Sequence, residues 1–289
     1  MCIRDRVSSV DYSADVPIGA GILRQLSDVY RKVRNTSRYL LGNLHDFVPS
    51  RDAIAIGDLP LLDRWMLQRT ATVLDQISEA FERYEFFRFF QLLQNFCVAD
   101  LSNFYLDIAK DRRYVSAPID KRRRSCQTVM ALIIERLAAA IAPVLCHMAE
   151  DIWQNIPYPT GRESVFLNGW PTVPEEWRDD SLHAPMQELR DLRAAVNKVL
   201  EECRSKRKLG ASLEAAVRLE ARTPALQDAL LWLQSKGDQE VDGLRDWLLV
   251  SQLQIGGEPW AELLASDDNV LAVIEVALSR GEKCERCWH

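Results

Sequence analysis

Residues 22–44 read ILRQLSDVYRKVRNTSRYLLGNL, and this stretch decides the fold of the first half of the chain. Its apolar side chains recur every three or four residues, which places them on one face of a helix at about 100° per residue. They are Ile22, Leu26, Val29, Val33, Leu40 and Leu44. An apolar stripe of this length has to be buried against other helices, so it predicts one member of a helical bundle.

The opposite face of the same predicted helix is basic. Its members are Arg24, Arg31, Arg34, Asn35 and Arg38, and only Asp28 offsets their charge. Guanidinium groups one turn apart suit the phosphates or the exposed base edges of a nucleic acid. The alternative is a solvated helix face without a ligand, and the spacing alone leaves both interpretations open.

Further long helices follow at the same period. Residues 61–84, 86–108 and 121–141 predict three of them, and a last one runs from Pro143 to about Trp153. The segment 86–108 is so rich in Phe that we expect it at the centre of the bundle. Its rings are then core side chains and not a stacking surface for bases.

Two clusters of cations lie between the predicted helices. A basic turn follows residue 108, and Lys121 to Arg124 open the next helix, where positive charge opposes the helix dipole. An anionic partner would relieve that repulsion. The clusters add five candidate RNA contacts to those of the first helix: Lys110, Arg112, Arg113, Arg122 and Arg123.

The composition changes after residue 156. Residues 157–183 are rich in Pro and Gly and predict a linker, for which Trp170 and Trp177 would be anchors. A helix of mixed charge is expected over residues 184–208, with Gly210 as the residue that ends it.

Period-two alternation then replaces the helical period. Val217, Leu219 and Ala221 alternate with charged residues, and residues 248–255 and 270–278 also predict strands. A short helix is expected from residue 224 to 234. We therefore expect a mainly α protein: a helical bundle over residues 21–156, followed by a small α/β appendage over residues 184–280.

Composition and charge bound the class of protein. The 289 residues are 47% hydrophobic and 27% charged, as in ordinary globular proteins, with a net charge of −6. The acidic excess lies in residues 157–289, with 16 Lys and Arg against 23 Asp and Glu. The longest uncharged apolar run, residues 137–146, is too short to cross a membrane. Seven scattered cysteines favour a reducing cytoplasm over a disulfide framework.

The two ends of the chain carry unusual residues. Cys284 and Cys287 form a Cys-x-x-Cys pair just before His289, whereas structural zinc takes four protein ligands. We expect half of a zinc site, cut before its second pair; a redox pair or an inert surface dithiol is the alternative. Residues 1–6 lack the apolar region of a signal peptide and do not lead into the helical pattern. We expect them to be a foreign or mis-assembled start.

Several segments resemble the C-terminal part of the isoleucyl-tRNA synthetases, which are class I aminoacyl-tRNA synthetases. They are VSSVDYSAD at 7–15, YRKVRNTSR at 30–38, LDRW at 62–65, FYLDIAKDR at 104–112, RSCQT at 124–128, AVNKV at 195–199, GASLEAA at 210–216 and KCERCWH at 283–289. The resemblance extends over nearly the whole chain after Val7. Its last segment distinguishes the isoleucine enzymes from their valine and leucine relatives.

The resemblance implies a role for each part of the chain. Residues 21–156 would be an anticodon-binding helical bundle, and residues 7–20 the linker from a catalytic domain. Residues 184–280 would be a junction domain, and residues 281–289 the start of a zinc module held by Cys284 and Cys287.

The family attaches isoleucine to its tRNA with ATP, but its signatures His-Ile-Gly-His and Lys-Met-Ser-Lys-Ser are absent here. The resemblance therefore implies binding of tRNA(Ile), no catalytic residues in this chain, and ATP and magnesium only in a catalytic domain outside it. It also implies a monomer in the cytoplasm. A stand-alone, non-catalytic RNA-binding module and a fragment of a valine or leucine enzyme remain the alternatives.

Overall fold

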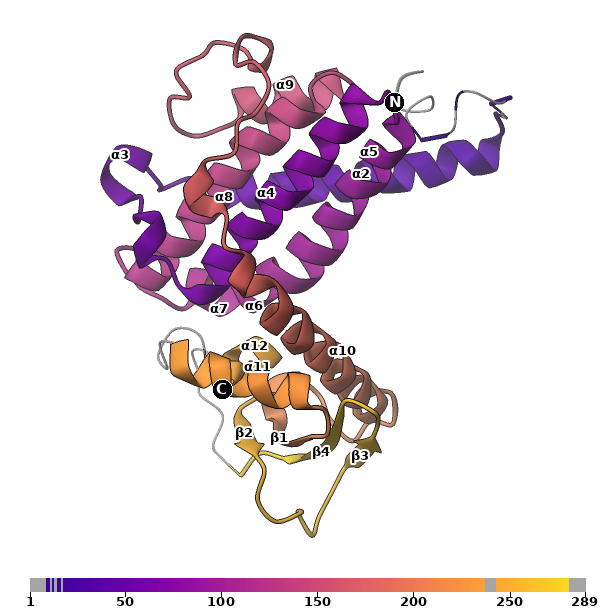
Figure 1. The fold of residues 1–289 in the computed structure, drawn as a ribbon, viewed down its shortest axis with the longest axis vertical. Helices are drawn as coiled ribbons and strands as arrows, with labels where there is room; N and C mark the ends of the chain where they lie inside the picture. Colours follow the sequence, from indigo (N-terminus) through magenta and orange to yellow (C-terminus); the bar gives the residue numbers. More distant parts are fainter. Residues whose placement is uncertain (1–8, 11, 13–14, 17, 237–242, 281–289) are drawn as a thin grey trace. The chain divides into compact units, whose positions relative to one another are not determined.

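The computed structural model describes residues 9, 10, 12, 15, 16, 18–236 and 243–280. The chain divides into two compact units. One unit comprises the residues up to 59 together with 66–178, and the other comprises 60–65 together with the residues from 179 onward. The fold is mainly α with one small sheet, as predicted (Figure 1).

The first unit is a bundle of helices that lie side by side (Figure 1). Its long members are α2 (Ala20–Gly42), α4 (Leu61–Glu82, from Met66 onward in this unit), α5 (Phe86–Asn95), α8 (Lys121–Ile141) and α9 (Cys146–Gln154). Short helices join them: α3 (Pro49–Asp52), η1 (Ile56–Asp58), α6 (Leu106–Ile108) and α7 (Lys110–Tyr114). The long helices begin and end close to where the apolar period predicts.

The most deeply buried helix of this unit is α8. We expected the Phe-rich segment in that position, but α8 has buried residues around its whole circumference from Arg124 onward. Its three consecutive small residues Ala138, Ala139 and Ala140 let neighbouring helices approach from every side. Four of the Phe rings are core side chains as predicted, since Phe89, Phe90, Phe96 and Phe104 are buried, whereas Phe86 is half-buried and Phe87 is exposed.

The second half of the Phe-rich segment winds more widely than an α-helix. Residues Phe96–Tyr105, element η2, form a π-helix that directly continues α5 and packs against α2. The Thr36 hydroxyl on α2 lies 2.9 Å from the Ser102 hydroxyl, and Arg69 donates to buried Asp100 over 2.9 Å. Wide turns of this kind are rare inside helices, and here polar contacts from α2 and α4 support the turn.

The predicted linker segment packs on the first unit up to Arg178. It forms the short turns η3 (Val165–Leu167) and η4 (Glu175–Trp177), and Val165 and Trp177 are buried. Both tryptophans anchor it as expected. Trp170 donates its indole N–H to Ser78 over 2.8 Å, and the guanidinium of Arg136 lies 4.4 Å from the centre of the Trp177 ring.

The second unit contains a four-stranded mixed sheet with the order β2-β1-β4-β3. Its elements are η5 (Asp180–Leu182), α10 (His183–Ser205), η6 (Ser212–Glu214), β1 (Ala215–Ala221), α11 (Pro224–Lys236), α12 (Leu244–Leu248), β2 (Gln252–Ile255), β3 (Ala265–Asp268) and β4 (Ala272–Leu278). Strands β1 and β2 are parallel, so the chain between them crosses over as α11 and α12. The other two pairings are antiparallel.

The two faces of this sheet differ. Val217 and Leu219 of β1 lie opposite Val276 and Ile274 of β4, and all four are buried on the face that α10, α11 and α12 cover. The alternate residues form the other face, where Ala216 lies opposite Ala277. The period-two prediction for β1 is therefore confirmed by its register.

Three sequence predictions for this unit were wrong in detail. The strand expected over residues 248–255 begins only at Gln252, because α12 ends at Leu249 in a left-handed conformation with φ 55°. Strand β3 was not predicted. Helix α10 ends before Arg207, which has φ 56°, so this arginine and not Gly210 reverses the chain.

None of the helices in the described part of the chain is long and apolar enough to span a membrane.

Candidate nucleic-acid interface

Helix α2 separates its two faces as the sequence predicts. Leu26, Val33 and Leu40 are buried in the first unit, and Thr36 and Ser37 beside them are buried as well. The four candidate RNA contacts of this helix are all exposed: Arg31, Arg34, Asn35 and Arg38. They lie at helical spacing, so one ligand can contact several of them along the face.

The arginines of this face differ in their partners. Arg31 forms an ion pair with Asp28 one turn earlier on the helix. Among the described residues, neither Arg34 nor Arg38 forms an ion pair or a side-chain hydrogen bond. An anionic ligand can meet these two guanidinium groups without displacing an acidic side chain of the described residues. We call Arg34, Asn35 and Arg38 the basic face of α2.

The candidates in α7 are placed differently. Lys110 is exposed and pairs with Asp107 over 2.7 Å, whereas Arg112 and Arg113 are only 3% and 4% exposed. Arg113 donates to the carbonyl oxygen of Leu106 over 2.9 Å and to that of Ala109 over 3.0 Å. These bonds hold the guanidinium inside the unit, so we leave Arg112 and Arg113 out of the interface.

Arg113 also joins α7 to α2. Its guanidinium carbon lies 4.4 Å from the centre of the Tyr39 ring, and one of its guanidinium N–H groups donates a hydrogen bond to the Tyr39 hydroxyl. Burial raises the pKa of Tyr39 to about 12, although the charge of Arg113 acts in the opposite direction. Tyr39 therefore stays neutral at physiological pH and accepts the bond from a permanently charged group.

The cations that open α8 are neutralised from a distant part of the chain. Asp120 caps the helix by accepting the Arg122 amide over 2.7 Å. Arg123 pairs with Asp46 over 2.9 Å, while buried Arg124 lies 3.5 Å from Asp46 and 3.6 Å from Asp52. Arg122 and Arg123 are half-buried, so an anionic ligand can reach them only in part.

These contacts lower the pKa values of the two aspartates. The hydrogen bond from Arg51, with help from the Val48 amide and Arg124, lowers the pKa of Asp52 to about 2. Burial would raise the pKa of Asp46, but the hydrogen bond from Gln127 and the charges of Arg123 and Arg124 outweigh it and keep this pKa below its ordinary value. Both aspartates are therefore ionised at neutral pH and compensate the basic run.

Sequence reasoning missed this network. Asp46 and Asp52 lie more than 70 residues before the arginines that they neutralise, and no local spacing connects the two segments. The sequence gives only a weak hint of this network. Positive charges at the start of a helix oppose the helix dipole, so acidic side chains from elsewhere in the fold are expected near them.

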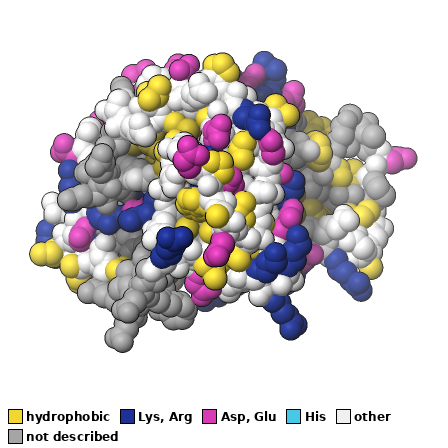
Figure 2. Space-filling view, turned by 90° about the horizontal axis from the view of Figure 1, so that it is seen from below, with side chains coloured by type: hydrophobic (Ala, Val, Ile, Leu, Met, Phe, Trp, Pro, Cys, Tyr) yellow, Lys and Arg dark blue, Asp and Glu magenta, His cyan; other side chains and the backbone are white. Residues whose placement is uncertain are grey.

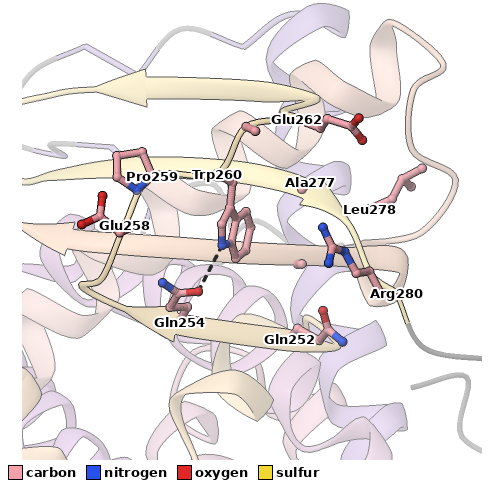
Figure 3. A pocket seen from close by; sticks show the side chains of 11 residues that line it. Gln252, Gln254, Glu258, Pro259, Trp260, Glu262, Ala277, Leu278 and Arg280 are labelled. Carbon is pink, nitrogen blue, oxygen red and sulfur yellow. Dashed lines mark hydrogen bonds between the residues drawn. The ribbon is translucent and has the colours of Figure 1, made fainter.

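A second candidate region is an open pocket of about 660 Å³ on the outer face of the sheet. Trp260 stands over the strands from the loop between β2 and β3 and donates its indole N–H to Gln254 over 3.1 Å (Figure 3). The lining residues are Ala216, Gln252, Gln254, Glu258, Pro259, Trp260, Ala261, Glu262, Ala277, Leu278 and Arg280. The lining mixes amide, acidic, basic and aromatic groups and holds no arrangement of nucleophile and base.

A buried ion pair supports the loop that carries Trp260. Arg218 of β1 donates two hydrogen bonds to Glu275, its direct neighbour on β4, over 2.7 and 3.1 Å. Arg218 also binds the Gly257 carbonyl, and the Trp260 amide donates to Glu275. The hydrogen bonds from Arg218 keep the pKa of Glu275 below its ordinary value. The pair is therefore charged and ties the loop to the sheet.

The predicted zinc ligands Cys284 and Cys287 lie outside the described residues. In the part of the chain that is described, no three His, Cys, Asp or Glu side chains come together to hold a metal ion. Cys97, Cys126 and Cys203 are buried and Cys146 is half-buried. Burial raises the pKa of the Cys97 thiol to about 12, as for a side chain that serves as a small apolar group.

Charged side chains are mixed on the surface drawn in Figure 2. Lys and Arg side chains there are interspersed with Asp and Glu side chains around an apolar area.

Comparison with known proteins identifies an anticodon-binding domain in the chain. Residues 63–219, more than half of the chain, match the anticodon-binding domain of tRNA ligase. Over 283 residues, 98% of the chain, it is 95% identical to isoleucine–tRNA ligase of Synechococcus sp. (strain CC9311). The isoleucine–tRNA ligases of Prochlorococcus marinus (strain MIT 9313) and Parasynechococcus marenigrum (strain WH8102) are 77% and 78% identical over the same length.

The matched region is only part of these relatives. The chain spans 29% of the length of each. The resemblance inferred from short sequence segments is confirmed, and it points to the isoleucine enzymes. The chain belongs to the family of anticodon-binding domains of tRNA ligases, in the form that isoleucine–tRNA ligases contain.

Proposed function

We propose that the chain binds the anticodon arm of tRNA(Ile) for an enzyme that attaches isoleucine to this tRNA with ATP. The observation that carries the proposal is the basic face of α2, where Arg34 and Arg38 are exposed and without ion pairs among the described residues. The family membership and the names of the relatives support the same reading.

The proposed mechanism is positioning. Arginine contacts to phosphates set the register of the RNA, and contacts to unpaired bases supply identity. Binding energy gained at the anticodon arm would orient the distant acceptor end toward a catalytic domain. The described residues contain no arrangement that activates an amino acid, so ATP and magnesium belong to the catalytic part of such an enzyme.

Zinc enters the proposal only through Cys284 and Cys287, which can supply two thiolates. A structural zinc site needs four ligands, and the described residues add no group of acidic, Cys or His side chains to complete one. No step of the proposed function depends on the metal. We further expect a monomer that works in the cytoplasm.

The test is a salt titration of tRNA binding to the 289-residue chain. Each phosphate contact releases counterions, so removing two contacts with Arg34→Ala/Arg38→Ala should weaken binding and reduce the salt slope by about two units. The matched control is Arg162→Ala/Lys198→Ala, which removes two cations that are also exposed and without ion pairs among the described residues. Equal effects of both double variants would contradict the proposal, because the loss would then reflect net charge alone.

A further inference from the structure

An exposed aromatic side chain lies near Tyr39, the residue that follows Arg38 in α2. Tyr114 ends α7 and is 66% exposed, although Arg112 and Arg113 just before it are almost completely buried. An exposed aromatic ring on a fixed backbone loses little conformational freedom when a ligand covers it. Tyr114 is therefore suited to contact a flat ligand.

The ring is supported from behind by Arg113. The guanidinium carbon of Arg113 lies 5.2 Å from the centre of the Tyr114 ring and 4.4 Å from that of the Tyr39 ring. Two backbone carbonyls hold this guanidinium in place. The cation is thus held within reach of both tyrosine rings.

The same contacts connect Tyr114 to α2. Tyr39 directly follows Arg38 in the helix, and Arg34 and Asn35 lie one turn earlier. Lys110, also exposed, begins the short helix that Tyr114 ends. Exposed cations and an exposed aromatic ring therefore occur on two elements, α2 and α7, that Arg113 and Tyr39 connect.

We propose that Tyr114 stacks on an unpaired base of the RNA whose phosphates contact Arg34 and Arg38. The inference rests on the proposed function and names one contact within it. A ring bordered by cations matches the alternation of base and phosphate in a single strand, whereas an apolar peptide would find charged groups around it. Stacking accepts any base, so Tyr114 contributes affinity and places the base, and other groups read its edge.

The test compares two RNA hairpins with the stem and loop of an isoleucine tRNA anticodon arm. One has its natural loop, and in the other the loop bases are removed and the backbone is kept. Tyr114→Ala in the 289-residue chain should weaken binding of the natural hairpin about tenfold, as expected for the loss of one stacked base. It should leave binding of the abasic hairpin and the salt slope unchanged.

Two further variants separate stacking from structure. Tyr114→Phe keeps the ring and should bind within about twofold of the parent chain, since stacking needs no hydroxyl. Phe166→Ala removes another exposed aromatic ring of the first unit, 57% exposed, and should leave binding unchanged. A 2-aminopurine placed in the loop gives a second measurement, because its emission is quenched on stacking and should rise with Tyr114→Ala.

The outcomes distinguish this inference from the proposed function. If the chain binds the hairpin and Arg34→Ala/Arg38→Ala reduces the salt slope, but Tyr114→Ala binds as the parent does, the stacking inference is wrong and the proposed function stands. An equal loss of the natural and the abasic hairpin with Tyr114→Ala would also overturn the inference. If the parent chain binds neither hairpin, the proposed function itself is wrong.

Discussion

Two arginine-rich regions of the first unit look alike in sequence and differ in structure. On α2, Arg34 and Arg38 are exposed, and they form no ion pair with described residues. In α7 and at the start of α8, Arg113 and Arg124 are buried, the first against backbone carbonyls and Tyr39 and the second against Asp46 and Asp52. A cluster of arginines therefore predicts a ligand surface only where the guanidinium groups do not already bind carboxylate or carbonyl oxygens of the fold.

The physical reason for the difference lies in the neighbours. A helix with one apolar face points its opposite face to solvent. The arginines of α2 are exposed because they lie on the side of the helix opposite its apolar residues. The arginines of α7 and α8 lie where other segments cross them, and burying a cation is tolerated only with partners for its donors. The donors of buried Arg113 and Arg124 are therefore used for contacts within the fold.

The largest expected effect comes from Arg218 in the second unit, because this arginine is buried in an ion pair with Glu275. Arg218→Met leaves the carboxylate of Glu275 buried without its partner, which costs about 3–5 kcal/mol. We expect the amides of β1 and β4 to lose most of their protection in hydrogen exchange, while helices of the first unit keep theirs.

A double variant separates charge from packing at this site. Arg218→Met/Glu275→Leu removes both charges, and apolar pairs often replace buried ion pairs without loss. Protection in β1 and β4 should therefore recover to a large extent. If the single and double variants unfold alike, the ion pair is not what the sheet depends on.

The network at the start of α8 should produce a smaller effect that depends on pH. The pKa of Asp52 is about 2 in the folded chain, below its ordinary value of 3.8, so its ionised form stabilises the fold. That stability is present above pH of about 4 and is lost as the pH falls toward 2. Asp46, with its pKa also lowered, acts in the same direction.

The measurement is the melting temperature of the first unit between pH 7 and pH 2. Asp52→Asn should lower it at pH 7 by roughly 2–4 °C, which corresponds to about 1 kcal/mol in a domain of this size. In the same variant, the melting temperature should fall less steeply than in the parent chain as the pH is lowered. Asp58→Asn is the control, because Asp58 is exposed and forms no ion pair with described residues. A parallel acid profile for Asp52→Asn and the parent chain would exclude this role.

The helices were predictable because their signal is local. The apolar period gives α2, α4 and α8 within a few residues, and alternation gives β1 and β4. Strand β3, with the sequence Ala-Ser-Asp-Asp, has no strand-forming residues and exists because β4 pairs with it. Arg207, two residues after the end of α10, adopts a conformation that usually favours Gly, so its residue type gives no sign of the reversal.

The candidate site was predictable to the same extent. Helical phase is enough to expose Arg34 and Arg38. The burial of Arg113 depends on the carbonyls of residues 106 and 109 and on Tyr39, which lies 74 residues away. No short stretch of the sequence contains all of these contacts. Counting the cations in a run therefore overestimates how many of them are exposed to a ligand.

The smallest effect concerns an ion pair within α2 itself. Arg31 pairs with Asp28, and their side chains are 66% and 60% exposed, so solvent screens the pair and Arg31→Ala should change stability by less than about 0.5 kcal/mol. In a salt titration of tRNA binding, Arg31→Ala should reduce the slope less than Arg34→Ala does, because the carboxylate already neutralises part of the charge of Arg31. Asp28→Asn should act in the opposite sense and increase the affinity slightly, since it frees Arg31 for a phosphate. If Arg31→Ala and Arg34→Ala reduce the slope equally and Asp28→Asn changes nothing, an ion pair on the helix surface does not withhold an arginine from RNA. The basic face would then extend a further turn toward the start of α2.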